Sequence, residues 1–521
     1  MTKNAPSTDA LGGSVSPYLA AHAAGPIPWR RWGVAAFAEA RDLDRPLFAS
    51  IGYHSCERCR ALRLGSFGDT AVARLLAERF VPVMVDRVCR PDVDAVYLDY
   101  VTATSGSGGW PLAVFLTPEG WPFFGETYLP RDASEDVADL IGVLETVADS
   151  WRDDRAGVRQ AAAAGEGFLR DQAAPRPRGD IDLTVVERAA EYVMREADET
   201  NGGFGTVPKF PLSTVTGFLL ALAHSLGDGE ARYHAMRSLE GRIRGGGYDH
   251  AGGGPFRYAA GADWTAPSPE KTLYDSALLL SDLARAHGVD PREEWAAAAR
   301  GTAAFLERDL AASGGLFHAA VATGAATPEP DTNLVVSWNA LAARGLLEAG
   351  ASFDDPHLTR SGLSTLDALL PLAARGDGVP HVLDDPSMED VRLLEDAAAL
   401  SAACLTAAEI AGRDDLLPTA AALHDEALAR FGSQDTLYMT DDKTDLPVRA
   451  REERDEPTPS GAATSAENAV RLWRLSGDSA RLEEARSLLE QWWAIADFSP
   501  LFAGRALDAA VGLLDATGGL R

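Results

Sequence analysis

The sequence predicts an α/β domain in its first third and an all-helical domain in the remainder. Strand and helix patterns alternate up to about residue 150, as expected for a sheet covered by helices. From about Asp182 onward, strand signals nearly vanish and Ala- and Leu-rich amphipathic segments follow one another. We therefore expect domains at 1–150 and 181–521, joined by a helix tail and linker at 151–180.

The first domain is predicted from short apolar runs that alternate with amphipathic stretches. Strands are expected at 46–52, 80–86, 112–117 and 121–127, and helices at 32–43, 56–65, 69–79 and 92–103. Strands separated by helices indicate parallel neighbours in the sheet. The sequence Pro118-Glu119-Gly120 predicts a turn between the last two strands.

The second domain is predicted to consist of roughly a dozen helices. They are expected at 185–197, 213–226, 230–243, 270–287, 293–310, 333–349, 357–373, 391–411, 418–431, 462–475, 480–496 and 502–514. An even number of paired helices favours a closed toroid or a solenoid. The sequence has no sharp repeat consensus, which makes a solenoid the less favoured of the two. Glycine-rich loops at 201–205 and 245–254 are places where a site could lie.

Composition narrows the possible functions. The chain of 521 residues is 46% hydrophobic, so we expect a globular protein of two or three domains. Its formal net charge of -29 disfavours a nucleic acid or an anionic membrane as partner. The N-terminus lacks an apolar leader segment and no stretch is long enough to span a bilayer, so we expect a cytoplasmic protein.

Cys56-Glu57-Arg58-Cys59 is the most informative motif. It follows an apolar strand and opens a helix, which is the arrangement of thioredoxin-like redox domains. The N-terminus of a helix stabilises a thiolate at Cys56, and Cys59 can then resolve a mixed disulfide. With only 4 cysteines in the chain, a disulfide scaffold is not indicated. Half of a zinc site and a pair of inert thiols remain as alternatives.

Several longer motifs carry a family resemblance. In the first domain they are Ser16-Pro17-Tyr18-Leu19, Ser50-Ile51-Gly52-Tyr53, Val85-Asp86-Arg87 and Gly108-Gly109-Trp110-Pro111-Leu112. In the second they include Pro208-Lys209-Phe210-Pro211, Tyr248-Asp249-His250, Glu270-Lys271, Leu273-Tyr274-Asp275 and Ser337-Trp338-Asn339. The chain thus resembles the two-domain family of thioredoxin-domain-containing proteins that spermatogenesis-associated protein 20 represents in animals.

The resemblance implies a thioredoxin-like domain followed by an (α/α)6 toroid of the six-hairpin glycosidase-like type. Such toroids occur in sugar epimerases and certain glycosidases, which brings carbohydrate metabolism into consideration. The chain departs from the family pattern at Glu57, Arg58 and Arg60, around the Cys pair. It also has Phe256 and Ser268 where the family has histidines. These departures favour a binding cavity over sugar chemistry in the toroid.

Pro111 and Cys89 complete the expected surroundings of the Cys pair. Trp110-Pro111 stands where a thioredoxin-like fold carries a cis-proline opposite the cysteines, so Pro111 is predicted to be cis. A cis bond there lets the backbone of Trp110 pair with a bound peptide or dithiol partner. Cys89 follows the strand that ends at Asp86 and is either a third redox thiol or a small apolar loop residue.

The toroid offers carboxylates, a histidine and aromatic side chains near helix starts. The candidates for a cavity are Tyr248, Asp249, His250, Glu270, Asp275, Trp338, Asn339, Glu395 and Asp396. If they face one cavity, they suit acid/base chemistry on a sugar; otherwise they are helix caps and core residues.

Three functions follow from these features: a thiol-disulfide oxidoreductase, a carbohydrate-active enzyme, or a binding scaffold with a degenerate toroid site. The expected substrate is a sugar-like small molecule or a thiol or disulfide of a protein. The residue pattern calls for no cofactor and no metal.

Overall fold

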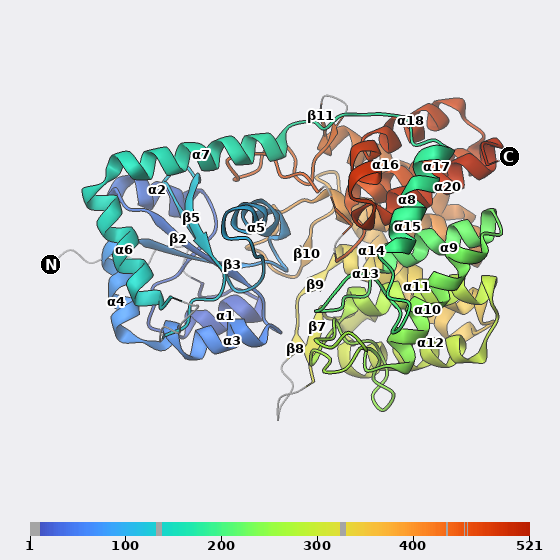
Figure 1. Cartoon of the computed structure of the whole chain (residues 1–521), viewed down its shortest axis with the longest axis horizontal. Helices are drawn as coiled ribbons and strands as arrows, with labels where there is room; N and C mark the ends of the chain where they lie inside the picture. The colour runs from blue at the N-terminus through green and yellow to red at the C-terminus, as the bar shows by residue number, and fades with distance from the viewer. Residues whose placement is uncertain are drawn as a thin grey trace.

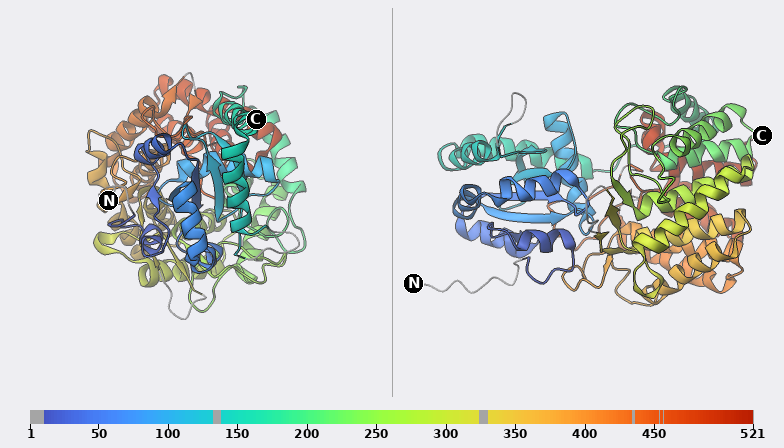
Figure 2. Two further views of the ribbon diagram at one scale, coloured as in Figure 1. Left: turned by 90° about the vertical axis from the view of Figure 1, so that its left-hand side faces the viewer. Right: turned by 90° about the horizontal axis from the view of Figure 1, so that it is seen from below.

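The computed structural model describes residues 11–131, 138–323, 330–433, 436–452, 454–455 and 457–520. The chain forms two domains that lie side by side, a mixed α/β domain and a larger helical one (Figures 1 and 2). The buried side chains gather in one large cluster in the helical domain and two smaller ones centred on the sheet. Of the helices in the described ranges, none has the length and apolar character needed to cross a membrane.

The N-terminal sheet has five strands in the order β1-β3-β2-β4-β5. They are β1 (Arg30–Arg31), β2 (Leu47–Gly52), β3 (Val81–Asp86), β4 (Leu112–Leu116) and β5 (Pro122–Glu126). β1, β3 and β2 are parallel, as expected, but β4 and β5 run antiparallel to their neighbours. The predicted turn at 118–120 joins β4 to β5 as a hairpin, whereas the antiparallel pairing of β4 with β2, across the helix α5 (Pro91–Ser105), differs from the expected parallel arrangement.

Helices cover the sheet much as the sequence predicts. The predicted helices correspond to α2 (Val34–Leu43), α3 (Glu57–Leu64), α4 (Thr70–Arg79) and α5 (Pro91–Ser105). Two further helices, α1 (Pro17–Ala23) and α6 (Leu140–Asp153), were not predicted. The segment expected as helix tail and linker begins with α7 (Arg155–Ala173), which packs on β5 and on α5 and α6. Figure 1 shows α7 running along the sheet domain towards the helical domain.

The helical domain is a closed double ring. Within the described residues, the inner helices contact one another in the cyclic order α9, α11, α13, α15, α17, α20 and back to α9. They are α9 (Ser213–Ser225), α11 (Leu273–Val289), α13 (Val336–Ser352), α15 (Leu394–Ala411), α17 (Gly461–Ser476) and α20 (Gly504–Thr517). The outer ring contains α8 (Leu183–Arg195), α10 (Gly229–Arg244), α12 (Glu293–Phe305), α14 (Pro356–Ala373), α16 (Leu417–Phe431) and α18 (Ser479–Glu490). Closure of the ring confirms the (α/α)6 toroid and excludes an open solenoid.

The inner and outer helices differ in sequence because they differ in burial. On α15, nearly every side chain from Leu394 to Ala408 is buried, so small Ala residues let neighbouring helices approach closely. On α10, buried residues recur every three to four positions, as in a helix that packs on one face only. A helix that is apolar on all sides therefore lies in the inner ring, and a helix that is apolar on one face lies in the outer ring.

Short strands lie between the two domains, at positions predicted as helix starts or loops. β6 (Glu270–Thr272), β7 (Ala320–Ala322) and β8 (Pro330–Asp331) form one small sheet, and β9 (Leu334–Val335) pairs with β10 (Val382–Leu383). Figure 1 shows β7 to β10 beside the sheet domain. The predicted helices 270–287 and 333–349 therefore begin later than expected, because their first residues pair as strands at the interface.

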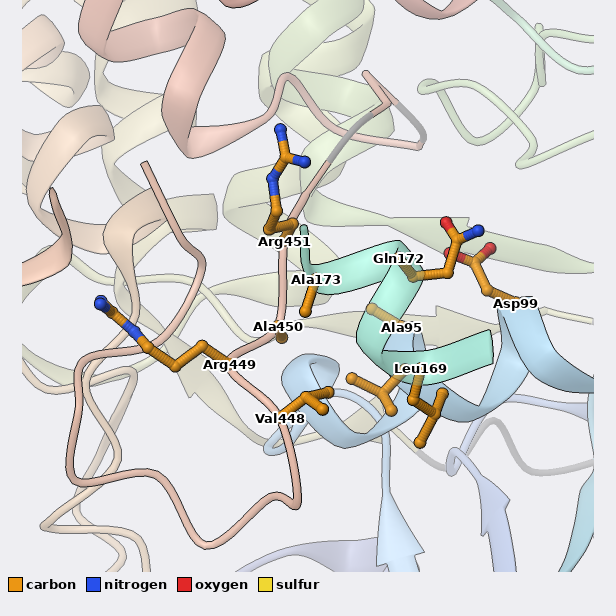
Figure 3. Close-up of a pocket in the computed structure, with 10 residues that line it drawn as sticks. Ala95, Asp99, Leu169, Gln172, Ala173, Val448, Arg449, Ala450 and Arg451 are labelled. Atoms are coloured by element: carbon orange, nitrogen blue, oxygen red, sulfur yellow. The ribbon is translucent and has the colours of Figure 1, made fainter. Parts of the chain in front are cut away.

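A small hollow of about 20 Å³ marks a second junction between the domains. It lies where Ala95 of α5, Leu169 of α7 and the segment 448–451 meet (Figure 3). Figure 3 shows Val448 directed towards Leu169, while Arg449 and Arg451 extend away from the hollow. A space of this size holds about one water molecule, so it is a packing junction and not a ligand site.

Candidate functional site

The Cys pair lies at the start of α3. Cys56 is the N-cap of this helix, and its Sγ accepts a hydrogen bond from the Cys59 N–H at 3.1 Å. Cys56 and Cys59 are paired as a disulfide, with their Cα atoms 5.2 Å apart. Helix N–H groups therefore face the sulfur of Cys56, as required to stabilise a thiolate there once the pair is reduced.

Pro111 lies beside this pair, and the bond between Trp110 and Pro111 is cis, as predicted. In the register of β2 and β4, Ile51 is opposite Leu112, which places Pro111 next to Gly52, at the start of the Cys loop. Gly52 is required there, because an added Cβ would lie 2.9 Å from the Sγ of Cys59. The strand pairing thus brings the predicted cis-proline to the Cys loop.

The Cys89 thiol is directed at Asp86 and Asn333. It is fully buried at the interface, with its Sγ 3.5 Å from Asp86 Oδ2 and 3.4 Å from Asn333 Oδ1. Burial, followed by the charges of Asp86 and Asp331, raises the pKa of the Cys89 thiol well above its usual value. Of the two alternatives, the buried structural thiol is therefore the one that the geometry supports.

A buried ion pair of the toroid contacts the loop that precedes Cys56. Glu270 accepts hydrogen bonds from the hydroxyls of Tyr53, at 3.3 Å, and Ser55. Arg257 pairs with Glu270 at 2.9 Å and also donates to the Tyr53 hydroxyl. The Arg257 guanidinium lies 5.4 Å from the ring centroid of Trp110. One toroid ion pair therefore touches both the Cys loop and the residue before Pro111.

The two domains enclose a cavity of about 400 Å³ at the N-terminal ends of the inner helices. The α/β domain contributes Arg87 and Trp110 to its wall, and the toroid contributes Tyr274, Trp338 and polar residues from several loops. Tyr274 and Trp338 pack edge to face, with ring centroids 4.7 Å apart. An aromatic wall with polar groups is typical of small-molecule sites, so this axial cavity is a second candidate site.

His381 anchors one side of the axial cavity. Its Nδ1 lies 2.9 Å from Asp396 Oδ2 and 3.5 Å from Glu395 Oε1, and its Nε2 lies 2.9 Å from the Val88 carbonyl oxygen. Burial alone would lower the pKa of His381, but Asp396 and Glu395 raise it to about 9. These three residues have the spacing of a metal site. Because both ring nitrogens are hydrogen-bonded, the arrangement fits an imidazolium ion pair better than a metal ligand.

Several carboxyl groups of the axial cavity have raised pKa values. Burial and Asp396, opposed by His381, raise the pKa of Glu395 to about 7. Burial and the neighbouring Glu395 raise the pKa of Glu452 well above its usual value, although Glu452 accepts a hydrogen bond from Gly461 N–H at 2.7 Å. Burial also raises the pKa of Asp275 to about 6. Near neutral pH this wall can therefore donate hydrogen bonds as well as accept them.

The structure divides the predicted toroid residues into three groups. Asp275, Trp338 and Glu395 line the axial cavity, and Glu270 lies at the interface with the Cys loop. Asn339 and Asp396 are buried and form hydrogen bonds with backbone groups. Asn339 donates to the Phe317 and Val335 carbonyls, and Asp396 accepts from Ser337 N–H.

Tyr248, Asp249 and His250 form the third group, away from the axial cavity. Tyr248 donates to the Ala298 carbonyl, Asp249 pairs with Lys271, and His250 contacts the Ile243 carbonyl. Tyr248 and His250 line a separate hollow against α10 and α12. The expectation that these three residues share one cavity with Glu395 does not fit this geometry, because their loop is turned towards the outer ring.

Sequence reasoning missed His381, Glu452 and Arg257 as site residues. His381 and Glu452 lie in irregular loops before α15 and α17, where no periodic pattern indicates which way a side chain points. Arg257 follows the glycine-rich loop that drew attention to Tyr248-Asp249-His250. The position of these residues in a loop before an inner helix indicates where a site could lie, but it does not indicate which residue of the loop points into the site.

Comparison with known proteins agrees with this two-domain structure. Residues 8–169 match the family described as Thioredox_DsbH, protein of unknown function, DUF255. Human spermatogenesis-associated protein 20 is 36% identical over 317 residues, which are 58% of this chain and 40% of the human protein. The chain thus spans about two fifths of the length of this relative.

Solved structures resemble the toroid. A sugar epimerase from a ruminal bacterium aligns with a TM-score of 0.52 and 14% identity, covering 64% of this chain and 99% of the epimerase. Cellobiose 2-epimerase from Spirochaeta thermophila aligns with a TM-score of 0.51 and 14% identity, covering 65% of this chain and 96% of the epimerase. At such identities the similarity shows the fold alone. The chain is therefore similar to spermatogenesis-associated protein 20 over 58% of its length, matches the Thioredox_DsbH family over residues 8–169, and has an (α/α)6 toroid fold in its C-terminal domain.

Proposed function

We propose that the protein is a thiol-disulfide oxidoreductase that uses Cys56 and Cys59. The observation that carries this proposal is the position of the pair: Cys56 caps α3 and is within bonding distance of Cys59, and cis-Pro111 lies beside the loop. The helix N-terminus favours the thiolate form of Cys56, which is the attacking species in disulfide exchange.

The reaction needs two successive exchanges. The Cys56 thiolate attacks one sulfur of a substrate disulfide, forms a mixed disulfide and releases the other sulfur as a thiolate, which takes up a proton. Cys59, after losing its proton, attacks Cys56 Sγ, forms the internal disulfide and releases the second substrate thiol. Two electrons pass to the substrate, and a dithiol reductant returns Cys56 and Cys59 to the reduced form.

A turnover assay with single-cysteine variants tests this proposal. Reduction of bis(2-hydroxyethyl) disulfide by dithiothreitol should be accelerated by the wild type and lost in Cys56→Ser. When Cys59→Ser is reduced, freed of dithiothreitol and then mixed with the disulfide alone, a mixed disulfide at Cys56 should form and be visible by intact mass. Cys404→Ala, which changes a buried cysteine of α15, is the matched control and should retain activity. Equal rates in wild type and Cys56→Ser would remove the redox assignment.

A second candidate function is the binding of a neutral, sugar-like molecule in the axial cavity. Among the described residues, the buried Tyr274 hydroxyl on its wall has no hydrogen-bond partner. A buried polar group of this kind gains most from a ligand that brings hydroxyl groups. Trp338 provides an apolar surface beside it, and the protonated forms of Glu395 and Glu452 can donate to hydroxyl oxygens.

Binding can be measured with two probes chosen from the substrates named for toroids of this fold, cellobiose and D-mannose. A bound probe should raise the melting temperature of the wild type, because it stabilises only the folded state. Trp338→Ala should abolish the shift, whereas His250→Ala, in the separate hollow, should retain it. No shift with either probe, at concentrations up to the millimolar range, would count against this candidate.

A further inference from the structure

We propose that the toroid restricts the Cys pair to small-molecule disulfides and thiols by covering the surface on which a protein substrate would bind. This inference rests on the proposed oxidoreductase function and names its class of substrate. It predicts that a disulfide with small substituents reacts at Cys56, whereas a disulfide within a folded polypeptide does not.

The covering contact is the Arg257–Glu270 ion pair. If the backbone of Trp110 pairs with a bound peptide, as the thioredoxin-like arrangement implies, that peptide lies between Trp110 and the loop before Cys56. Here Glu270 is hydrogen-bonded to Tyr53 and Ser55 of that loop. Arg257 lies 5.0 Å from the ring centroid of Tyr53 and 5.4 Å from that of Trp110. The toroid therefore holds both sides of the groove that a peptide would occupy.

Displacing the Arg257–Glu270 ion pair from the Cys loop costs free energy. The side chains of Arg257 and Glu270 are only 6% and 5% exposed, so a protein substrate that displaced them would have to separate a buried ion pair. Other contacts hold the toroid in the same place. His381 is hydrogen-bonded to the Val88 carbonyl, and Asp445 pairs with Arg90 at 2.6 Å.

The Cys pair is nevertheless not sealed. Cys56 is 7% exposed, and the next two residues, Glu57 and Arg58, are exposed on the first turn of α3. An exchange reaction requires only that one sulfur of the substrate reaches Cys56 Sγ in line with its own S–S bond. A disulfide with short flexible substituents meets this requirement in a narrow opening. A protein disulfide brings two backbone segments that collide with the toroid.

The experiment compares two disulfides under one reductant. The full chain is assayed with dithiothreitol and either bis(2-hydroxyethyl) disulfide or insulin, and each rate is divided by the uncatalysed rate with the same disulfide. The acceleration should be roughly a hundred-fold greater for the small disulfide, the scale set by opening a buried ion pair. Cys56→Ser should abolish the acceleration.

Two variants test the cause of the selectivity. Glu270→Gln weakens the cover next to the Cys loop, and Asp445→Asn weakens the interface through Arg90 without touching that loop. Both should raise the ratio of the insulin rate to the small-disulfide rate several-fold, and Asp445→Asn, which lies away from the Cys loop, should do so with little change in the small-disulfide rate. Glu294→Gln, which removes an ion pair with Arg244 inside the toroid, is the matched control and should leave both rates unchanged.

The outcomes separate the two proposals. Equal acceleration for insulin and the small disulfide, or an insulin rate that neither interface variant raises, would overturn the exclusion of proteins while the oxidoreductase function stands. Absence of acceleration with both disulfides, or an acceleration that survives Cys56→Ser, would overturn the oxidoreductase function and this inference together.

Discussion

His381 of the toroid is hydrogen-bonded through Nε2 to the backbone carbonyl of Val88 in the α/β domain, at 2.9 Å. Its other ring nitrogen faces Asp396, so one buried imidazolium links the start of α15 to the loop after β3. The domain interface is thus built around a titratable group, and its strength should depend on pH.

His381 should stabilise the folded protein only while it is protonated. Because its pKa rises from 6.5 to about 9 in the folded state, this contribution is complete below the unfolded value of 6.5 and is lost as the pH rises through 9. A shift of this size corresponds to roughly 3 kcal/mol of unfolding free energy. Urea unfolding should show a large deficit for His381→Gln at pH 6 and a small one at pH 10. A deficit independent of pH would contradict the charged assignment.

Tyr274→Phe should separate stability from ligand binding. The Tyr274 hydroxyl is buried without a hydrogen-bond partner among the described residues, so its removal should leave the unfolding free energy unchanged or raise it by about 1 kcal/mol. Tyr248→Phe is the matched control, because that hydroxyl donates to the Ala298 carbonyl at 2.9 Å and its loss should cost about 1 kcal/mol. Tyr274→Phe should also weaken any sugar-dependent thermal shift. Destabilisation of Tyr274→Phe to the same degree as Tyr248→Phe would argue against a hydroxyl reserved for a ligand.

Gly461 should tolerate no side chain, because α17 begins against α15 at this point. A Cβ there would lie 2.6 Å from the Glu395 backbone nitrogen, so Gly461→Ala must shift one of the two helix starts and should cost about 1–3 kcal/mol. Gly167→Ala, on α7 with no atom within 4 Å of the added Cβ, should instead stabilise the protein by about 0.5–1 kcal/mol. Thermal unfolding of the two variants compares these effects. A Gly461→Ala variant as stable as the wild type would contradict the packing of the helix starts.

Asp445 should couple the unfolding of the two domains. It accepts from the buried Arg90 at 2.6 Å and from Trp32 Nε1 at 3.1 Å, both in the α/β domain. Asp445→Ala leaves Arg90 with only Asp92 as an ion-pair partner in the described residues, and should cost about 2–4 kcal/mol. Calorimetry should show the unfolding transition of the wild type separating into two transitions in this variant. A single transition at the wild-type temperature would show that the contact does not hold the domains together.

The sequence allowed the helical rings and the Cys pair to be predicted, because each has a strong local signal. Inner helices such as α15 are apolar on all sides, and Cys56-Glu57-Arg58-Cys59 follows a buried strand directly. The antiparallel pairing of β4 with β2 and the short strands β6 to β10 have weaker signals. Strands of two or three residues show no alternation, and their pairing depends on partners distant in sequence.

The axial cavity could be predicted only in part. Asp275, Trp338 and Glu395 were found because they stand in the first turns of inner helices, whose ends share one side of the toroid. His381 and Glu452 lie in loops whose conformation is set by the opposite domain and by Gly461, so no local pattern reveals them. Tyr248-Asp249-His250 was predicted as part of the cavity because a glycine-rich loop indicates an unusual backbone conformation. Here that conformation places Asp249 in an ion pair with Lys271.

The central claim, a redox-active Cys pair, is tested most directly by titrating the full chain in mixtures of reduced and oxidised dithiothreitol. Thiols are then quenched with an alkylating reagent and counted by mass spectrometry. Our account predicts a two-electron transition in which Cys56 and Cys59 gain and lose the reagent together, absent in Cys56→Ser and unchanged in Cys404→Ala. Alkylation of Cys56 and Cys59 independently of one another, or at every ratio of the two forms, would contradict it.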